Sequence, residues 1–152
     1  MTEQRESLFL AGAGYSARYL AALWTKAGRG PVYGTTRSAD KCAALETDGI
    51  MPVLLDGGDV PVEVLAGSHW VISTPPGDEG CPSLNLFGGS ASKAASITYL
   101  STTGVYGDLN GGWAFEWSSL NPGSPRSERR VEAETAWAAA DAAEAAAWGA
   151  AL

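Results

Sequence analysis

The sequence predicts an α/β fold in which helices cover both faces of a parallel sheet of about five strands. Short apolar runs alternate with segments of helical spacing along the chain. A glycine-containing turn at residues 12–17 joins the first predicted strand to the first predicted helix. Of the 152 residues, 45% are hydrophobic and 18% are charged. This size and composition suit one folded domain, residues 1–152.

The first strand–helix–strand unit covers residues 7–35. Residues 7–11 form a short apolar run bounded by glycine, which is typical of a buried parallel strand. Residues 16–26 carry apolar side chains at helical spacing, and Gly28 closes that helix. Residues 31–35 form the second predicted strand. The unit therefore has the βαβ order of a doubly wound sheet.

The middle of the chain continues the alternation. A second helix is expected over residues 39–46, with Ser38 as its N-cap. The third strand is expected over residues 51–55, followed by a short helix over 60–65. The fourth strand, residues 69–73, stops before two prolines, which cannot continue a ladder.

The last part of the chain combines two regular elements with two irregular segments. Residues 77–92 and 107–124 are rich in glycine and other loop-forming residues, and no element is expected in either. Residues 95–101 form the fifth predicted strand. Residues 128–147 are dominated by alanine and glutamate and predict a long helix.

Composition and charge exclude several functions. A net charge of −7 argues against nucleic-acid binding, which needs a concentrated basic surface. No segment approaches the ~20 apolar residues that span a bilayer, so no membrane partner is expected. Cys42 and Cys81 lie far apart without metal-ligand spacing, so we expect no metal. The N-terminal residues do not resemble a secretory signal, and a cytoplasmic location is expected.

The turn at residues 12–17 matches the G-x-G-x-x-A form of a dinucleotide-binding motif. Gly12 permits the tight turn, Gly14 lets the backbone approach a pyrophosphate, and Ala17 allows close helix–strand packing. Tyr15 and Ser16 complete the first turn of the helix, whose N-terminus favours an anion. The motif predicts a Rossmann-type sheet that binds a dinucleotide cofactor. A glycine-rich turn without a ligand is the alternative.

The end of the second strand favours NADP over NAD. An NAD site usually has an acidic residue there for the ribose 2′-hydroxyl. This strand is followed by Thr36, Arg37 and Ser38. Arg37 can form a charge-assisted contact with a 2′-phosphate, helped by the two hydroxyls. A surface arginine without a ligand is the alternative reading.

Residues that end the third and fourth strands complete the expected cofactor site. Ligands of doubly wound sheets bind at the carboxyl ends of the strands. Ser73, Thr74 and Pro75 end the fourth strand and are expected to line the cofactor groove. Asp56, after the third strand, can accept a hydrogen bond from the adenine amino group or cap the following turn.

Two later segments carry a family resemblance. Residues 99–107, YLSTTGVYG, resemble the S-[ST]-x-x-V-Y-G signature of extended short-chain dehydrogenases/reductases. Residues 121–134 resemble that family's P-x-x-P-Y-x-x-x-K segment. The family includes NAD(P)-dependent epimerases and dehydratases. The resemblance implies an oxidoreductase or epimerase-like enzyme acting on a small carbonyl or sugar-like substrate, with Thr102 as the catalytic hydroxyl.

The chain departs from the family at the catalytic pair. Arg126 and Arg130 stand where the family has its tyrosine and lysine. Arginine stays protonated and offers no acceptor, so neither can perform the tyrosine's proton transfer. The pattern is similar to atypical members, and a non-catalytic dinucleotide-binding sensor or subunit is the alternative function.

Length is a second departure, because extended members continue into a C-terminal substrate-binding region. The chain is expected to be a shortened member, a fragment of a longer gene product, or a subunit whose partner completes the site. A sheet that ends at its fifth strand leaves an open edge, and we expect a homodimer.

Overall fold

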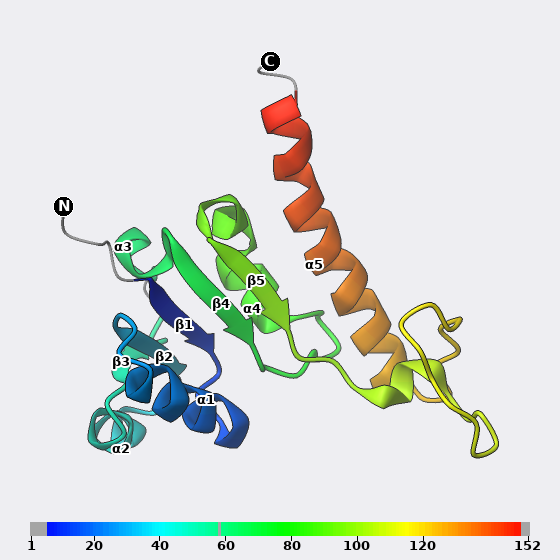
Figure 1. Cartoon of the computed structure of the whole chain (residues 1–152), viewed down its shortest axis with the longest axis horizontal. Helices are drawn as coiled ribbons and strands as arrows, with labels where there is room; N and C mark the ends of the chain where they lie inside the picture. Colours follow the sequence, from blue (N-terminus) through cyan, green and yellow to red (C-terminus); the bar gives the residue numbers. More distant parts are fainter. Residues whose placement is uncertain (1–5, 58, 150–152) are drawn as a thin grey trace.

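The computed structural model describes residues 6–57 and 59–149, with side chains placed as far as Ala140. Its centre is a five-stranded sheet in the order β3-β2-β1-β4-β5, and all four pairings are parallel. Figure 1 shows the strands side by side with helices around them. The strands are β1 (Ser7–Ala11), β2 (Val32–Thr36), β3 (Met51–Leu54), β4 (Ser68–Ile72) and β5 (Ser96–Tyr99). The predicted α/β fold class is therefore confirmed.

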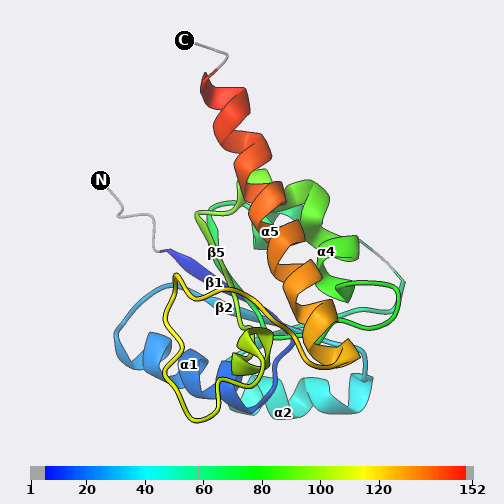
Figure 2. The same cartoon turned by 90° about the vertical axis from the view of Figure 1, so that its right-hand side faces the viewer.

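Helices connect successive strands and cover both faces of the sheet. Helices α1 and α2 pack on one face, and α3, α4 and α5 lie on the opposite face (Figures 1 and 2). The α-helices are α1 (Tyr15–Lys26), α2 (Cys42–Thr47), α3 (Val62–Leu65), α4 (Pro82–Phe87) and α5 (Pro125–Gly149). Three 3-10 helices are η1 (Ala39–Lys41), η2 (Gly88–Lys93) and η3 (Thr103–Tyr106). No helix among the described residues is both long enough and apolar enough to cross a membrane.

The side chains of β1 alternate between two separate cores. Leu8 and Leu10 pack under α1 and α2, whereas Phe9 packs on the opposite face. Phe9 meets Trp70 edge-on at 5.6 Å between ring centroids and Phe87 at 5.3 Å. Because both faces of β1 are buried, its sequence is a continuous apolar run rather than an alternating one.

One local expectation was wrong, and a second, Ser38 as an N-cap, is confirmed in position but not in its capping hydrogen bond. Residues 77–92 were expected to be irregular, but α4 and η2 lie within residues 82–93. Pro82 begins α4, where its missing N–H is tolerated, and Phe87 anchors the helix in the core. Ser38 precedes η1 in extended conformation, but its side chain makes no capping hydrogen bond. Its backbone N–H instead donates to Thr36 Oγ1 at 3.2 Å, and that bond shapes the turn.

Candidate functional site

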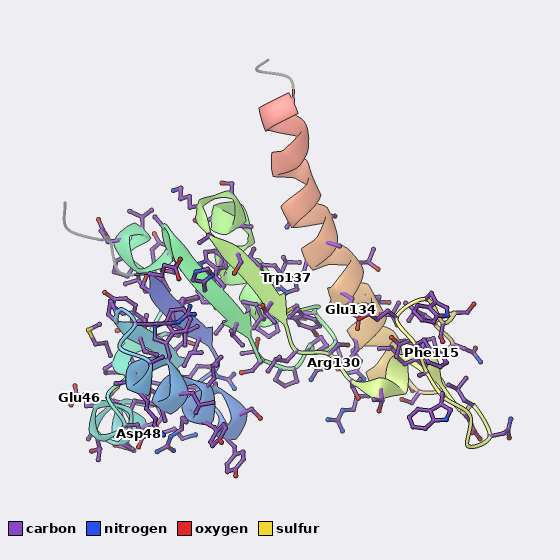
Figure 3. All side chains as sticks on the ribbon, in the orientation of Figure 1. Glu46, Asp48, Phe115, Arg130, Glu134 and Trp137 are labelled. Atoms are coloured by element: carbon purple, nitrogen blue, oxygen red, sulfur yellow. The ribbon has the colours of Figure 1, made fainter. Side chains whose placement is uncertain are left out.

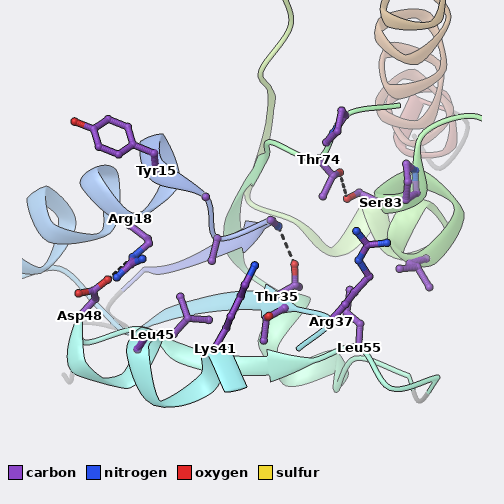
Figure 4. A pocket seen from close by; sticks show the side chains of 18 of the residues that line it. Tyr15, Arg18, Thr35, Arg37, Lys41, Leu45, Asp48, Leu55, Thr74 and Ser83 are labelled. Carbon is purple, nitrogen blue, oxygen red and sulfur yellow. Dashed lines mark hydrogen bonds and ion pairs between the residues drawn. The ribbon is translucent and has the colours of Figure 1, made fainter. Parts of the chain in front are cut away.

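An open cleft of about 1150 Å³ lies at the ends of β1, β2 and β4 and is also lined by residues of α1 and α2 (Figure 4). Its walls combine apolar side chains with three cations, a carboxylate and several hydroxyls. The cleft is lined by Gly12, Ala13, Gly14, Tyr15, Arg18, Tyr19, Ala22, Thr35, Thr36, Arg37, Lys41, Ala44, Leu45, Asp48, Leu55, Thr74, Pro75, Pro76, Gly77, Pro82, Ser83 and Leu86.

The turn after β1 is held in place from two neighbouring strands. Gly12 has a φ of +93°, a conformation that side chains other than glycine's rarely adopt. Its N–H donates to Thr35 Oγ1 at 2.8 Å, and its carbonyl accepts from Ser73 Oγ at 2.6 Å. A Cβ at Gly12 would lie 2.9 Å from Ser73 Oγ. The hydrogen bond from Ser73 therefore fixes the position of the turn. Ser73 itself is not among the residues that line the cleft.

Gly14 leaves the entrance to α1 open. It is the N-cap of the helix, and a Cβ placed on it would meet no atom within 4 Å. The first turn of α1 contains no acidic residue, and its first N–H groups have no partner within the helix. This end of α1 is thus suited to an anion. Ala17 is buried beneath the turn, whereas Ser16 is exposed outside the cleft lining.

Two cations stand at the end of β2. Arg37 follows the strand directly and Lys41 is the last residue of η1; both are exposed and line the cleft. Figure 4 shows both side chains directed into it. Neither forms an ion pair or side-chain hydrogen bond with any part of the chain that the structure describes. The Asp48 carboxylate in the same lining is paired with Arg18. The cations are therefore available to a ligand.

Thr74 and Pro75 form the wall beyond β4, and the Thr74 hydroxyl pairs with Ser83 Oγ at 2.5 Å. Leu55 supplies an apolar surface opposite them. Asp56, the next residue, is exposed, takes part in an interaction, and is not among the residues that line the cleft. The wall can therefore receive a planar, partly apolar group such as a purine.

The structure brings most, but not all, of the predicted site together. The predicted residues that line the cleft are Gly12, Gly14, Tyr15, Thr36, Arg37, Thr74 and Pro75. Those outside the lining are Ser16, Ala17, Ser38, Asp56, Ser73 and Thr102. Sequence reasoning missed Arg18, Tyr19, Lys41 and Ser83. Helical spacing was the available signal for Arg18 and Tyr19, which follow Tyr15 at i+3 and i+4 on one face of α1.

Thr102 lies away from the cleft lining, after β5. It is the N-cap of η3, and its Oγ1 accepts a hydrogen bond from the Gly104 N–H at 3.3 Å. Its side chain is exposed. The Thr102 hydroxyl therefore caps η3.

Arg130 joins α5 to the end of β5. The residue is only 9% exposed, and its Nη1 donates to the Leu100 carbonyl at 2.8 Å and to the Tyr99 hydroxyl at 3.2 Å. Figure 3 shows Arg130 on the side of α5 that faces the sheet. Burial raises the pKa of Tyr99 above its ordinary value, although Arg130 acts in the opposite direction. Arg126 is exposed.

Comparison with known proteins supports the fold. No family model matches the chain, and no curated protein matches it. A functionally unknown conserved protein from Silicibacter pomeroyi is 34% identical, with a TM-score of 0.78 over 89% of this chain and 49% of its own. A "putative epimerase" from Burkholderia cenocepacia is 17% identical, with a TM-score of 0.61 over 89% of this chain and 50% of its own.

A third structure, designated SsCR, is 19% identical, with a TM-score of 0.62 over 88% of this chain and 53% of its own. The chain thus spans about half the length of each of these three proteins. All three likenesses place it among proteins with a Rossmann-like α/β fold, and the epimerase shares that fold.

Proposed function

We propose that the chain binds NADP in the cleft between α1 and the end of β2. The observation that carries this proposal is the pairing of an unobstructed Gly14 with two unpaired cations, Arg37 and Lys41. The pyrophosphate would lie against the α1 N-terminus, where N–H groups and the helix dipole favour negative charge. The 2′-phosphate would lie between Arg37 and Lys41, each of which can donate charge-assisted hydrogen bonds.

The remaining walls suit the rest of the cofactor. Leu55 and Pro75 offer apolar surfaces for the adenine ring, with the Thr74 hydroxyl beside them. No carboxylate lines the cleft next to Arg37, so nothing there mimics the ribose-binding acid of NAD sites. These features favour NADP over NAD at the same position.

For activity, we propose an oxidoreductase or epimerase-like function of the short-chain dehydrogenase/reductase type, on a small carbonyl or sugar-like substrate. Support comes from the residue 99–107 motif and from the shared fold. A bound nicotinamide would supply hydride transfer. Thr102 is the proposed catalytic hydroxyl and would hold a substrate oxygen by a hydrogen bond. Arg126 and Arg130 cannot transfer a proton at neutral pH.

A non-catalytic dinucleotide-binding sensor or subunit is the second candidate. The observation that favours it concerns Arg130, which stands where the family has its lysine: its guanidinium is engaged in hydrogen bonds within the protein. Its Nη1 is bonded to the Leu100 carbonyl and the Tyr99 hydroxyl, which are groups of the protein itself. Under this alternative, cofactor binding remains but no carbonyl compound oxidises NADPH.

Cofactor titration tests the proposal. NADPH and NADH fluorescence would be followed separately for the wild type, Arg37→Ala, Lys41→Ala and the control Arg126→Ala, which removes an exposed arginine outside the cleft. Wild type should prefer NADPH. Arg37→Ala should weaken NADPH binding about tenfold or more, the equivalent of one charge-assisted contact, and Lys41→Ala about threefold.

The NADH affinity should stay unchanged in all three variants. Equal losses for both cofactors would contradict a 2′-phosphate contact, and no binding of either cofactor to the wild type would reject the site. If NADPH binds, a screen of carbonyl substrates for NADPH oxidation then separates the enzyme from the sensor.

A further inference from the structure

One face of α1 lines the cleft and carries a single charged side chain. The residues of this face that line the cleft are Tyr15, Arg18, Tyr19 and Ala22. Because they follow one another at helical spacing, they lie on one side of the helix. Figure 4 shows Arg18, the charged member, reaching from α1 toward α2, where it meets Asp48. The cleft therefore contains a third cation besides Arg37 and Lys41.

The ion pair uses only one edge of the Arg18 guanidinium. Its Nε donates to Asp48 Oδ2, and this is the one polar contact that the side chain makes with the part of the chain that the structure describes. The remaining N–H donors, on Nη1 and Nη2, have no partner there. Because the guanidinium is planar and rigid, holding Nε also sets the direction of the other donors. Arg18 is thus oriented by the protein while most of its donors stay available to a ligand.

Asp48 is poorly placed to act as a purely stabilising partner. It is the C-cap of α2, at the end of a helix where the dipole disfavours negative charge. Both side chains of the pair are partly exposed, and exposed ion pairs contribute little to stability. Asp48 is also the one carboxylate among the described residues that line the cleft. Its position suits the orientation of Arg18 better than the attachment of α2 to α1.

The charges that line the cleft match those of a phosphate monoester. The described lining residues include three cations and one carboxylate, which leaves two positive charges; these residues are Arg18, Arg37, Lys41 and Asp48. A phosphate monoester carries a charge of about −1.5 to −2 at neutral pH. Arg37 and Lys41 come from the end of β2 and from η1, whereas Arg18 comes from α1. A phosphate group in the cleft would therefore receive donors from two sides.

We propose that Arg18 takes part in recognising the 2′-phosphate of the cofactor and that Asp48 positions Arg18, an inference that rests on the proposed NADP binding. Nη1 and Nη2 of Arg18 donate to phosphate oxygens from the α1 side, while Arg37 and Lys41 donate from the β2 side. NADH lacks this phosphate, so Arg18 contributes to the preference for NADPH and not to the binding of the rest of the cofactor. Asp48 acts only through Arg18 and does not touch the cofactor.

Titration of Arg18→Ala with NADPH and with NADH tests the contact. NADPH affinity should fall about tenfold, the equivalent of one charge-assisted hydrogen bond, and NADH affinity should stay unchanged. The matched control is Arg29→Ala, which removes another arginine from an exposed ion pair, with Glu6, outside the cleft lining. This control should leave both affinities unchanged.

Two substitutions at Asp48 test its positioning role. Asp48→Asn and Asp48→Ala remove the same charge, but only asparagine keeps a side-chain oxygen that can accept from Arg18 Nε. Asp48→Ala should therefore bind NADPH about threefold more weakly than Asp48→Asn, with no difference for NADH. In an Arg18→Ala background the two substitutions should give equal NADPH affinities, because their difference acts through Arg18.

The outcomes separate this inference from the proposed function. If the wild type binds NADPH and Arg18→Ala binds it equally well, or loses NADH affinity to the same extent, the assignment of Arg18 to the 2′-phosphate is overturned while NADP binding stands. Equal NADPH affinities for Asp48→Asn and Asp48→Ala would overturn the role of Asp48. A wild type that binds neither cofactor rejects the proposed function, and this inference with it.

Discussion

The cleft between α1 and the end of β2 and the junction between β5 and α5 lie at the same carboxyl edge of the sheet, yet they use their polar groups differently. In the cleft, Arg37 and Lys41 have no partner among the described residues. At the junction, the Thr102 hydroxyl accepts from a backbone N–H, and Arg130 donates to groups of β5. One region therefore leaves charged groups without a partner among the described residues, whereas the polar groups of the other are bonded within the protein.

The surroundings of the two regions differ in how deeply they are buried. Near the cleft, β1 is buried on both faces and paired on both sides. Beyond β5, residues 107–124 expose Trp113 (86%) and Trp117 (81%), although Phe115 stacks on Trp117 at 5.0 Å. Such exposed aromatic area is typical of contact surfaces. The comparison teaches that two regions at one edge of a Rossmann-like sheet can differ, because one leaves its cations without a partner among the described residues and the other uses its polar groups within the protein.

The largest effect on stability is expected from Gly12→Ala, which distorts the turn after β1 at the cleft. Its methyl group would lie 2.9 Å from Ser73 Oγ and 3.0 Å from Thr74 Cγ2, at a φ that alanine disfavours. Strain of this kind costs about 1–3 kcal/mol of unfolding free energy. Chemical denaturation measures that loss, and NADPH affinity should fall about tenfold or more with it.

Gly14→Ala is the matched control, because its methyl group meets no protein atom within 4 Å. The free energy of unfolding should change by less than about 1 kcal/mol. NADPH affinity should nevertheless fall, since the methyl group projects into the space assigned to the pyrophosphate. Wild-type affinity in Gly14→Ala would place the cofactor elsewhere.

Arg130→Met, at the junction between β5 and α5, should have an intermediate effect on the free energy of unfolding. It keeps the aliphatic bulk but removes the part-buried hydrogen bond to the Leu100 carbonyl, a loss of about 1.5–3 kcal/mol for a bond from a charged donor. Thermal or chemical unfolding measures it. NADPH affinity should remain within about twofold of the wild type. A large loss of affinity at unchanged stability would instead make Arg130 a cofactor contact.

The smallest effect is expected from Tyr99→Phe and depends on pH. Burial raises the folded-state pKa of Tyr99 above its ordinary value, so its contribution is fully present below about pH 10 and is lost as the pH rises through the folded pKa. The side chain is only partly buried, so solvent screening keeps the change in stability small.

Unfolding free energies at neutral pH and above about pH 10 provide the measurement. The wild type should lose slightly more stability between the two conditions than Tyr99→Phe does. A larger alkaline loss in the phenylalanine variant would contradict the assigned direction of the pKa shift.

Sequence by itself determined the five strands and the glycine turn after β1. The β1 strand and the glycine at Gly12 follow from local requirements, namely continuous burial and a positive φ. The expected strands each appear within about two residues of their predicted bounds. Arg37 was assigned to the cleft because it follows β2 directly, and parallel strands present their carboxyl ends together.

Tertiary structure alone decided which distant residues meet. Lys41 lines the cleft from the end of η1, and Ser73 holds the Gly12 turn by a hydrogen bond because β4 lies beside β1. Arg130 becomes an anchor because α5 returns to the end of β5. Periodicity and turn chemistry act over a few residues, whereas these contacts depend on how whole elements pack. That is why the sequence located the edge of the sheet at which the cleft lies but not the full set of groups that line it.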